Sequence, residues 1–91
     1  MQGAHAGEVE TSQLLAITKN QVKKNRVKPG YVGVLNAETN RPLYERGISA
    51  LSKIGVISDP SQSDIEKGRA YLEKLADYIT EDIKKYLQNK I

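Results

Sequence analysis

The feature that most constrains the fold is a long amphipathic stretch near the end of the chain. Between Ile65 and Leu87, apolar residues recur every three or four positions, the spacing that places them on one side of an α-helix. They are Ile65, Gly68, Leu72, Leu75, Ala76, Ile79, Ile83, Tyr86 and Leu87. Ser63 with Glu66, or alternatively Ser61 with Asp64, predicts a capping box at its start. About 26 residues make a helix on the order of 40 Å long, which requires a substantial surface to pack against.

Two further features belong to this helical pattern. Gly68 on the apolar side predicts a close approach of another backbone, the alternative being simple tolerance of an unfavourable residue. A second helix is expected over 6–18, where Val9, Ser12 and Leu15 recur at helical spacing. Its apolar side and low charge predict that it is largely buried.

The middle of the chain, 19–59, has a less regular pattern. Residues 31–35 have the composition of a short strand, and Asn40 to Pro42 predict a loop. Residues 43–53 fit either a helix interrupted by Gly47 or extended chain, so the conformation of 36–58 is left open.

Size and composition predict a small core. The chain has 91 residues, of which 38% are apolar, and no cysteine. A single small domain of this kind lies near the limit of stability without a partner. We therefore expect a homo-oligomer, or association with a missing segment. No run of apolar residues approaches the roughly 20 that a membrane helix needs, and the first residues do not resemble a signal peptide, so a cytoplasmic protein without a membrane partner is expected.

A basic stretch is the strongest charge feature, although the net charge is only +3. It comprises Lys19, Lys23, Lys24, Arg26 and Lys28. No tyrosines alternate with these cations, as a stacking platform for single-stranded nucleic acid would require. A solvated basic face is therefore expected, and no nucleic-acid partner.

The segment 3–12, Gly-Ala-His-Ala-Gly-Glu-Val-Glu-Thr-Ser, has the most chemical potential. His5 is the single histidine of the chain and precedes the expected first helix, with Glu8 and Glu10 in that helix's first turns. A histidine exchanges protons near neutral pH, and a nearby carboxylate can hold its ring. The alternative is an exposed histidine at a frayed terminus beside two ordinary first-turn glutamates.

This segment resembles the signature of the creatininase family, in which His-Ala-Gly leads to Glu-Thr-Ser at the start of a buried helix. A second similarity lies at 55–60, Gly-Val-Ile-Ser-Asp-Pro, followed by Glu-Lys-Gly at 66–68. The family has Gly where this chain has Ser58, and often an acidic residue where it has Gln2. The two motifs occur in the family's order and span nearly the whole chain.

The resemblance implies an amidohydrolase with two divalent metals, Zn or Mn. It assigns His5 as the proton shuttle to the leaving nitrogen and Glu10 as an orienting carboxylate, and it gives Glu8 no role. Thr11 and Ser12 are expected to let their helix pack closely on a sheet. The family's metal ligands come from Glu-x-His, Asp and His-Gly-Gly segments that precede the His-Ala-Gly motif, and nothing in this chain resembles them.

The resemblance also implies the fold class, an α/β/α layered domain. Residues 1–91 are expected to be a single segment corresponding to its C-terminal part, mainly α with one or two short strands and a long C-terminal helix. The expected function is part of a hydrolase acting on a small cyclic amide or formamide, inactive without the N-terminal part that holds the metals. The alternative is a non-catalytic helical module for oligomerisation or partner binding.

Overall fold

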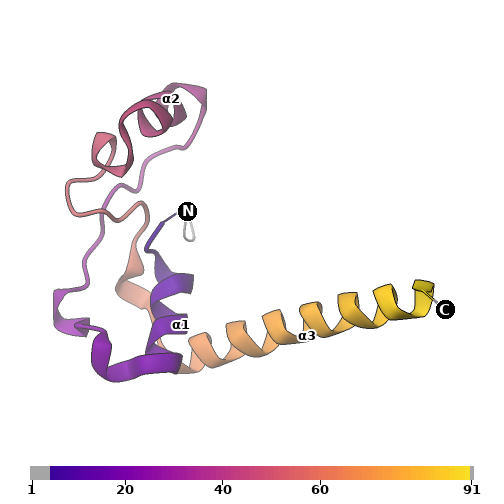
Figure 1. Cartoon of the computed structure of the whole chain (residues 1–91). Coiled ribbons are helices and arrows are strands. Elements are labelled where there is room, and N and C mark those ends of the chain that lie inside the picture. Colours follow the sequence, from indigo (N-terminus) through magenta and orange to yellow (C-terminus); the bar gives the residue numbers. More distant parts are fainter. Residues whose placement is uncertain (1–4, 91) are drawn as a thin grey trace.

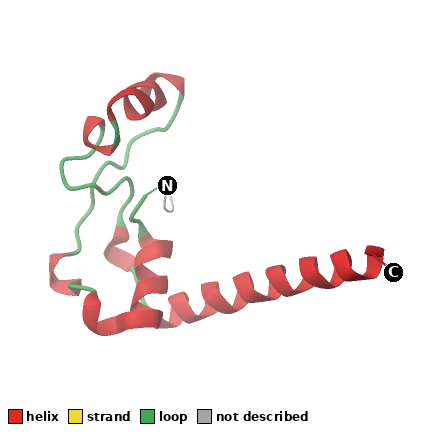
Figure 2. Cartoon of the chain, in the orientation of Figure 1, coloured by secondary structure: helices red, strands yellow, loops and turns green. Residues whose placement is uncertain are grey.

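The computed structural model describes residues 5–90, which are mainly helical (Figures 1 and 2). The α-helices are α1 (Glu8–Thr18), α2 (Ala37–Arg46) and α3 (Ile65–Lys90). Single 3₁₀ turns connect them at Lys19–Gln21, Lys24–Arg26, Ile48–Ala50 and Pro60–Gln62. The predicted mainly helical segment with a long C-terminal helix is confirmed.

Strand pairing within 5–90 consists of one antiparallel bridge, between His5 and Ile57. The strand predicted at 31–35 is not formed. Tyr31 N–H donates to the Val56 carbonyl at 2.9 Å. The chain then bends at Gly33, which lies against the Tyr31 ring. The Tyr31 hydroxyl donates to the Val34 carbonyl at 2.7 Å. The Gly30 N–H also donates to the Ser58 carbonyl at 3.0 Å, so the pairing with 56–58 comprises Gly30 and Tyr31 and ends at the local hydrogen bond to Val34.

The core lies where α1 crosses the first turns of α3 (Figure 1). Gly68 of α3 faces the backbone of Ser12, so closely that a Cβ atom there would overlap the Ser12 carbonyl and lie 3.0 Å from the Gln13 nitrogen. The close backbone approach predicted from Gly68 is therefore confirmed. Of the two small residues expected to pack on a sheet, Ser12 packs against helix α3 and Thr11 lines a pocket described below.

This core is small and partly polar. The buried large apolar side chains of the described segment are Leu15 and Ile57. The buried polar residues are Ser12, Ser52, Ser58 and Ser63. With few apolar side chains to bury, the fold depends on hydrogen bonds among small residues as well as on the hydrophobic effect.

Helix α2 contradicts one prediction and decides an open alternative. Asn36 and Thr39 form a capping box, with Thr39 N–H donating to Asn36 Oδ1 at 3.0 Å. Because this cap starts the helix at Ala37, Pro42 falls within it, at the loss of one backbone hydrogen bond. The loop predicted at 40–42 is wrong. The helix ends at Arg46, and Gly47, with φ 85°, separates it from the 3₁₀ turn Ile48–Ala50; of the two alternatives for 43–53, the structure therefore has the helix interrupted by Gly47.

Helix α3 starts with a different cap from the predicted ones. Asp64 Oδ2 accepts the backbone N–H groups of Glu66 and Lys67 at 3.0 and 3.1 Å. Ser63 is buried, and its hydroxyl donates to the Pro60 carbonyl at 2.6 Å. Because the Ser63 hydroxyl is engaged by the Pro60 carbonyl, Asp64 is the residue left to cap the helix.

Beyond its first turns, α3 extends away from the rest of the chain (Figure 1). Its apolar stripe is covered only near Gly68. The side chains of Leu75, Ile79, Ile83 and Leu87 are 49, 52, 54 and 55% exposed. None of the helices within 5–90 has the length and hydropathy to cross a membrane.

Candidate functional site

The two sequence motifs, 3–12 and 55–60 with the Glu-Lys-Gly that follows it, come together around the start of α1. Ile57 N–H donates to the His5 carbonyl at 3.0 Å, which places the segment 55–60 beside the histidine. The Glu-Lys-Gly of 66–68 lies against α1, with Gly68 on Ser12. Motifs about 50 residues apart in sequence therefore form one structural unit.

Glu10 holds the turn between His5 and α1. Both residues have exposed side chains. Glu10 Oε2 accepts the backbone N–H of Ala6 at 3.0 Å. Ala6 has φ 51°, a left-handed conformation that is uncommon for a residue with a Cβ. The Glu10 carboxylate and the bridge to Ile57 hold this turn from both sides, and so determine where the His5 backbone lies.

Glu8 makes contacts that sequence reasoning missed. Its Oε2 accepts the Tyr71 hydroxyl at 2.7 Å, and its Oε1 accepts the Ser12 hydroxyl at 3.1 Å. Lys67 Nζ lies 3.8 Å from the same Oε1, and the Glu8 side chain is only 15% exposed. The hydrogen bond to Glu8 raises the pKa of Tyr71, with burial and the charge of Glu8 acting in the same direction.

Ser12 extends this network to the cap of α3. Its hydroxyl oxygen accepts the Asp64 backbone N–H at 3.0 Å while donating to Glu8. The sequence shows that Glu8 and Ser12 are four residues apart, as are Lys67 and Tyr71, so each pair lies on one face of its helix. That the two faces meet depends on the crossing of α1 and α3, which no local pattern reports.

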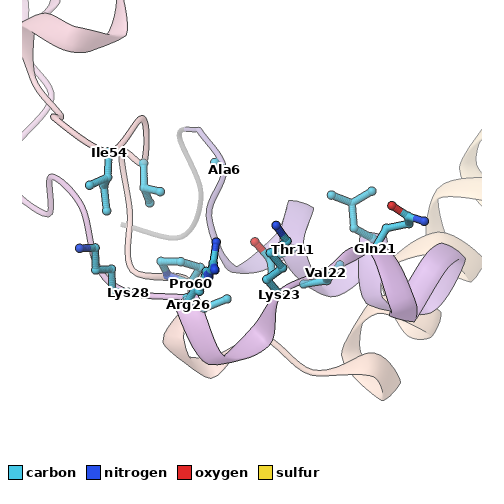
Figure 3. A pocket seen from close by; sticks show the side chains of 12 residues that line it. Ala6, Thr11, Gln21, Val22, Lys23, Arg26, Lys28, Ile54 and Pro60 are labelled. Carbon is cyan, nitrogen blue, oxygen red and sulfur yellow. The ribbon is translucent and has the colours of Figure 1, made fainter.

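A pocket of about 360 Å³ opens on the other side of α1 (Figure 3). Its apolar wall comprises Leu14, Val22, Val27, Ile54, Val56 and Pro60. Lys23, Arg26 and Lys28 supply three cations, and Figure 3 shows Lys28 below Ile54, and Arg26 next to Pro60. The basic stretch of the sequence is therefore partly built into a concave site.

The described residues do not by themselves fit a pair of metals. No group of three or more His, Cys, Asp or Glu side chains comes together within 5–90. The possible metal ligands near the start of α1 are His5, Glu8 and Glu10. His5 and Glu10 lie on either side of one turn, and the Glu8 carboxylate already accepts hydrogen bonds from Tyr71 and Ser12. Gln2 lies outside the described residues.

Comparison with known proteins decides the family. Residues 1–83 match the creatininase family model, described as creatinine amidohydrolase. The chain belongs to the creatininase family. This confirms the family predicted from the two motifs, and creatininase-family enzymes are generally metal-dependent hydrolases. No solved structure matches the chain.

Two curated relatives are each named mycofactocin precursor peptide peptidase. The protein from Mycobacterium ulcerans (strain Agy99) is 38% identical over 74 residues, which cover 81% of this chain and 29% of the relative. The protein from Mycolicibacterium smegmatis (strain ATCC 700084 / mc(2)155) is 29% identical over 83 residues, covering 91% of this chain and 33% of the relative. The chain thus spans about a third of the length of these relatives. Their names describe a peptide substrate, in contrast to the small cyclic amide or formamide expected from the sequence.

Proposed function

We propose that this chain contributes the proton-transfer part of a creatininase-family hydrolase that cleaves an amide bond in a peptide. The observation that carries the proposal is the family match across the turn at 5–10, where Glu10 holds the backbone beside His5. The names of the two relatives favour a peptide over a small cyclic amide. The proposed location of this hydrolysis is the cytoplasm.

In this proposal the two residues have different tasks. His5 has an exposed side chain, and an imidazole can give a proton to a leaving amide nitrogen near neutral pH. Glu10 keeps its carboxylate on the Ala6 amide, which orients His5 through the backbone. Divalent metal, Zn or Mn, would be held by side chains outside 5–90. It would supply the polarisation of the amide carbonyl and the activation of water that such ions provide.

A chimera tests the proposal. The segment of the M. ulcerans peptidase that aligns with this chain is replaced by the chain itself, and cleavage of the precursor peptide is measured with Zn²⁺ or Mn²⁺ added. We expect the chimera to be active and its His5→Gln variant to lose on the order of 100-fold or more in kcat, the usual contribution of a positioned acid–base group. Glu10→Gln keeps a hydrogen-bond acceptor for Ala6 and should lose less.

Arg41→Gln provides the control, because Arg41 pairs with Glu45 on the surface of α2. A folded chimera whose activity is unchanged by His5→Gln would contradict the role of the histidine. A folded, metal-loaded chimera with no activity would contradict the proposal that this chain can serve a peptidase.

A second candidate function, self-association through α3, is favoured by the exposed apolar stripe. Leu75, Ile79, Ile83 and Leu87 lie on one side of the helix, each about half exposed. A contiguous exposed apolar surface of this kind is uncommon on a soluble monomer. We propose a second copy of this chain as the partner.

In the proposed dimer the apolar stripes of two α3 helices face each other. When two antiparallel copies cross at Ile83, Ile79 of one copy lies opposite Leu87 of the other. The exposed charged side chains of Glu81 and Lys85 lie on the side of α3 away from the stripe, where they remain in solvent.

The oligomeric state of the chain tests this candidate. We expect a concentration-dependent dimer in sedimentation velocity, converted to monomer by Ile83→Glu. Val34→Glu makes the same type of change at another exposed apolar residue, which is 69% exposed and lies outside α3, and should leave the dimer intact. A monomer at all concentrations, or a dimer indifferent to Ile83→Glu, would contradict the proposal.

A further inference from the structure

The pocket beside α1 combines three cations with an apolar wall and contains no carboxylate. Its twelve lining residues include Lys23, Arg26 and Lys28 but neither Asp nor Glu. The ion pairs formed within residues 5–90 do not involve these three side chains. Like charges gathered at one concave surface repel one another, and an anion placed among them relieves that repulsion.

The cations are carried by short, hydrogen-bonded turns. Arg26 N–H donates to the Lys23 carbonyl at 2.9 Å, and Val27 N–H donates to the Lys24 carbonyl at 3.3 Å. These bonds bring Lys23 and Arg26 to the same side of the 3₁₀ turn, while Lys24 does not line the pocket. An arginine in such a position can bind a planar carboxylate with two parallel hydrogen bonds.

The apolar wall of the pocket suits a small aliphatic group. Leu14 and Ile54 are 50 and 44% exposed, so a large part of their apolar surface is available to a ligand. Val22, Val27 and Val56 complete this wall. A volume of about 360 Å³ lies at the small end of the range for ligand sites, enough for one or two residues of a peptide.

The position of the pocket connects it with the proposed chemistry. Its lining includes Ala6 and Thr11, the neighbours in sequence of His5 and Glu10. Figure 3 shows Ala6 on the loop above the pocket and Thr11 on α1 next to Lys23. A group bound here therefore lies next to the turn that carries the predicted proton donor.

We propose that this pocket binds the carboxylate-bearing aliphatic end of a peptide. Lys23, Arg26 and Lys28 hold the carboxylate, and the wall around Ile54 receives the aliphatic side chain. This inference rests on the proposed function, because it names the part of the peptide substrate that lies beside His5. Inorganic phosphate shares the negative charge but has nothing to place against the wall.

Binding to the whole 91-residue chain tests the inference without requiring turnover. The probes are acetyl-Gly-Val with a free carboxylate, the same dipeptide as its C-terminal amide, acetyl-Gly with a free carboxylate, and inorganic phosphate. Calorimetry gives the affinities. We expect the free acid to bind about tenfold more tightly than the amide, since hydrogen bonds to charged groups are the stronger class. The preference should diminish as salt screens the cations.

Three variants separate the two parts of the pocket. Arg26→Gln combined with Lys28→Gln should abolish the preference for the free acid. Lys24→Gln removes the same charge from the same turn outside the pocket, and should retain the preference. Ile54→Ala should weaken acetyl-Gly-Val several-fold and leave acetyl-Gly unchanged. Circular dichroism verifies that each variant is folded.

Several results would overturn the inference. They are no binding by the folded chain, equal affinity for acid and amide, or phosphate binding as tight as acetyl-Gly-Val with no effect of Ile54→Ala. The chimera assay reports separately on the proposed function. Selective binding together with an inactive chimera would support the pocket and reject the hydrolase role. An active chimera without selective binding would support the hydrolase role and reject the pocket.

Discussion

The contact of Gly68 with α1 leads to a prediction that opposes the usual effect of glycine on helices. Replacing a glycine inside an exposed helix by alanine normally stabilises it by about 1 kcal/mol. In this fold the added methyl group of Gly68→Ala would overlap the Ser12 carbonyl. Backbone cannot move aside as the end of a flexible side chain can, so α1 and α3 must separate.

Separating α1 from α3 lowers the free energy of unfolding in two ways, both of which oppose the gain in helix propensity. Overpacking of a closely packed contact costs about 1–3 kcal/mol. The hydrogen bonds from Tyr71 to Glu8 and from Asp64 to Ser12 cross the same contact, and each contributes about 1 kcal/mol. With overpacking at about 2 kcal/mol, the net loss in unfolding free energy is about 3 kcal/mol. For a chain of this size, that lowers Tm on the order of 12–24 °C.

Thermal unfolding, followed by the far-ultraviolet circular dichroism of the helices, measures this loss. Ala70→Gly is the control, because Ala70 is exposed in the same part of α3 and reports helix propensity alone, about 1 kcal/mol. Gly68→Ala should be clearly the more damaging of the two. An unchanged or raised Tm for Gly68→Ala would refute the close packing of α3 on α1.

Three further predictions concern the polar network at the same crossing. Ser12→Ala should destabilise the fold by about 1–3 kcal/mol in urea unfolding, because it leaves the Asp64 amide without its acceptor; the exposed Ser49→Ala should have little effect. Asp64→Ala should cost about 0.5–2 kcal/mol in the same assay, through loss of the α3 cap, and no loss would show that the cap is dispensable. Because the folded-state pKa of Tyr71 is raised above 10.0 by Glu8, the stability that this hydrogen bond contributes is present below pH 10 and is lost as the pH rises through the folded pKa. Tm measured across that alkaline range should therefore decline less steeply in Tyr71→Phe than in the wild type, and equal slopes would contradict the contact.

The sequence predicted what local patterns can encode. The helices over 8–18 and 65–90 follow from apolar residues at helical spacing. Gly68 on such a stripe predicted a close backbone contact, and the His-Ala-Gly and Gly-Val-Ile motifs predicted the family. Local propensity was a weaker guide between these helices. Pro42 was interpreted as a loop residue, whereas the capping box of Asn36 and Thr39 places it inside α2.

The tertiary structure decided which surfaces meet, and this changed the importance of individual residues. Glu8 had no assigned role and Ser12 was only a small residue, yet the crossing of α1 and α3 makes both of them the centre of a hydrogen-bonded network. The cations of the basic stretch are exposed, as expected of a solvated face, but three of them also line a pocket with Ile54, which is remote in sequence. Helical periodicity is a property of one segment, so it can be deduced from order along the chain. The partner of a polar side chain depends on how two segments cross, and only the assembled fold contains that information.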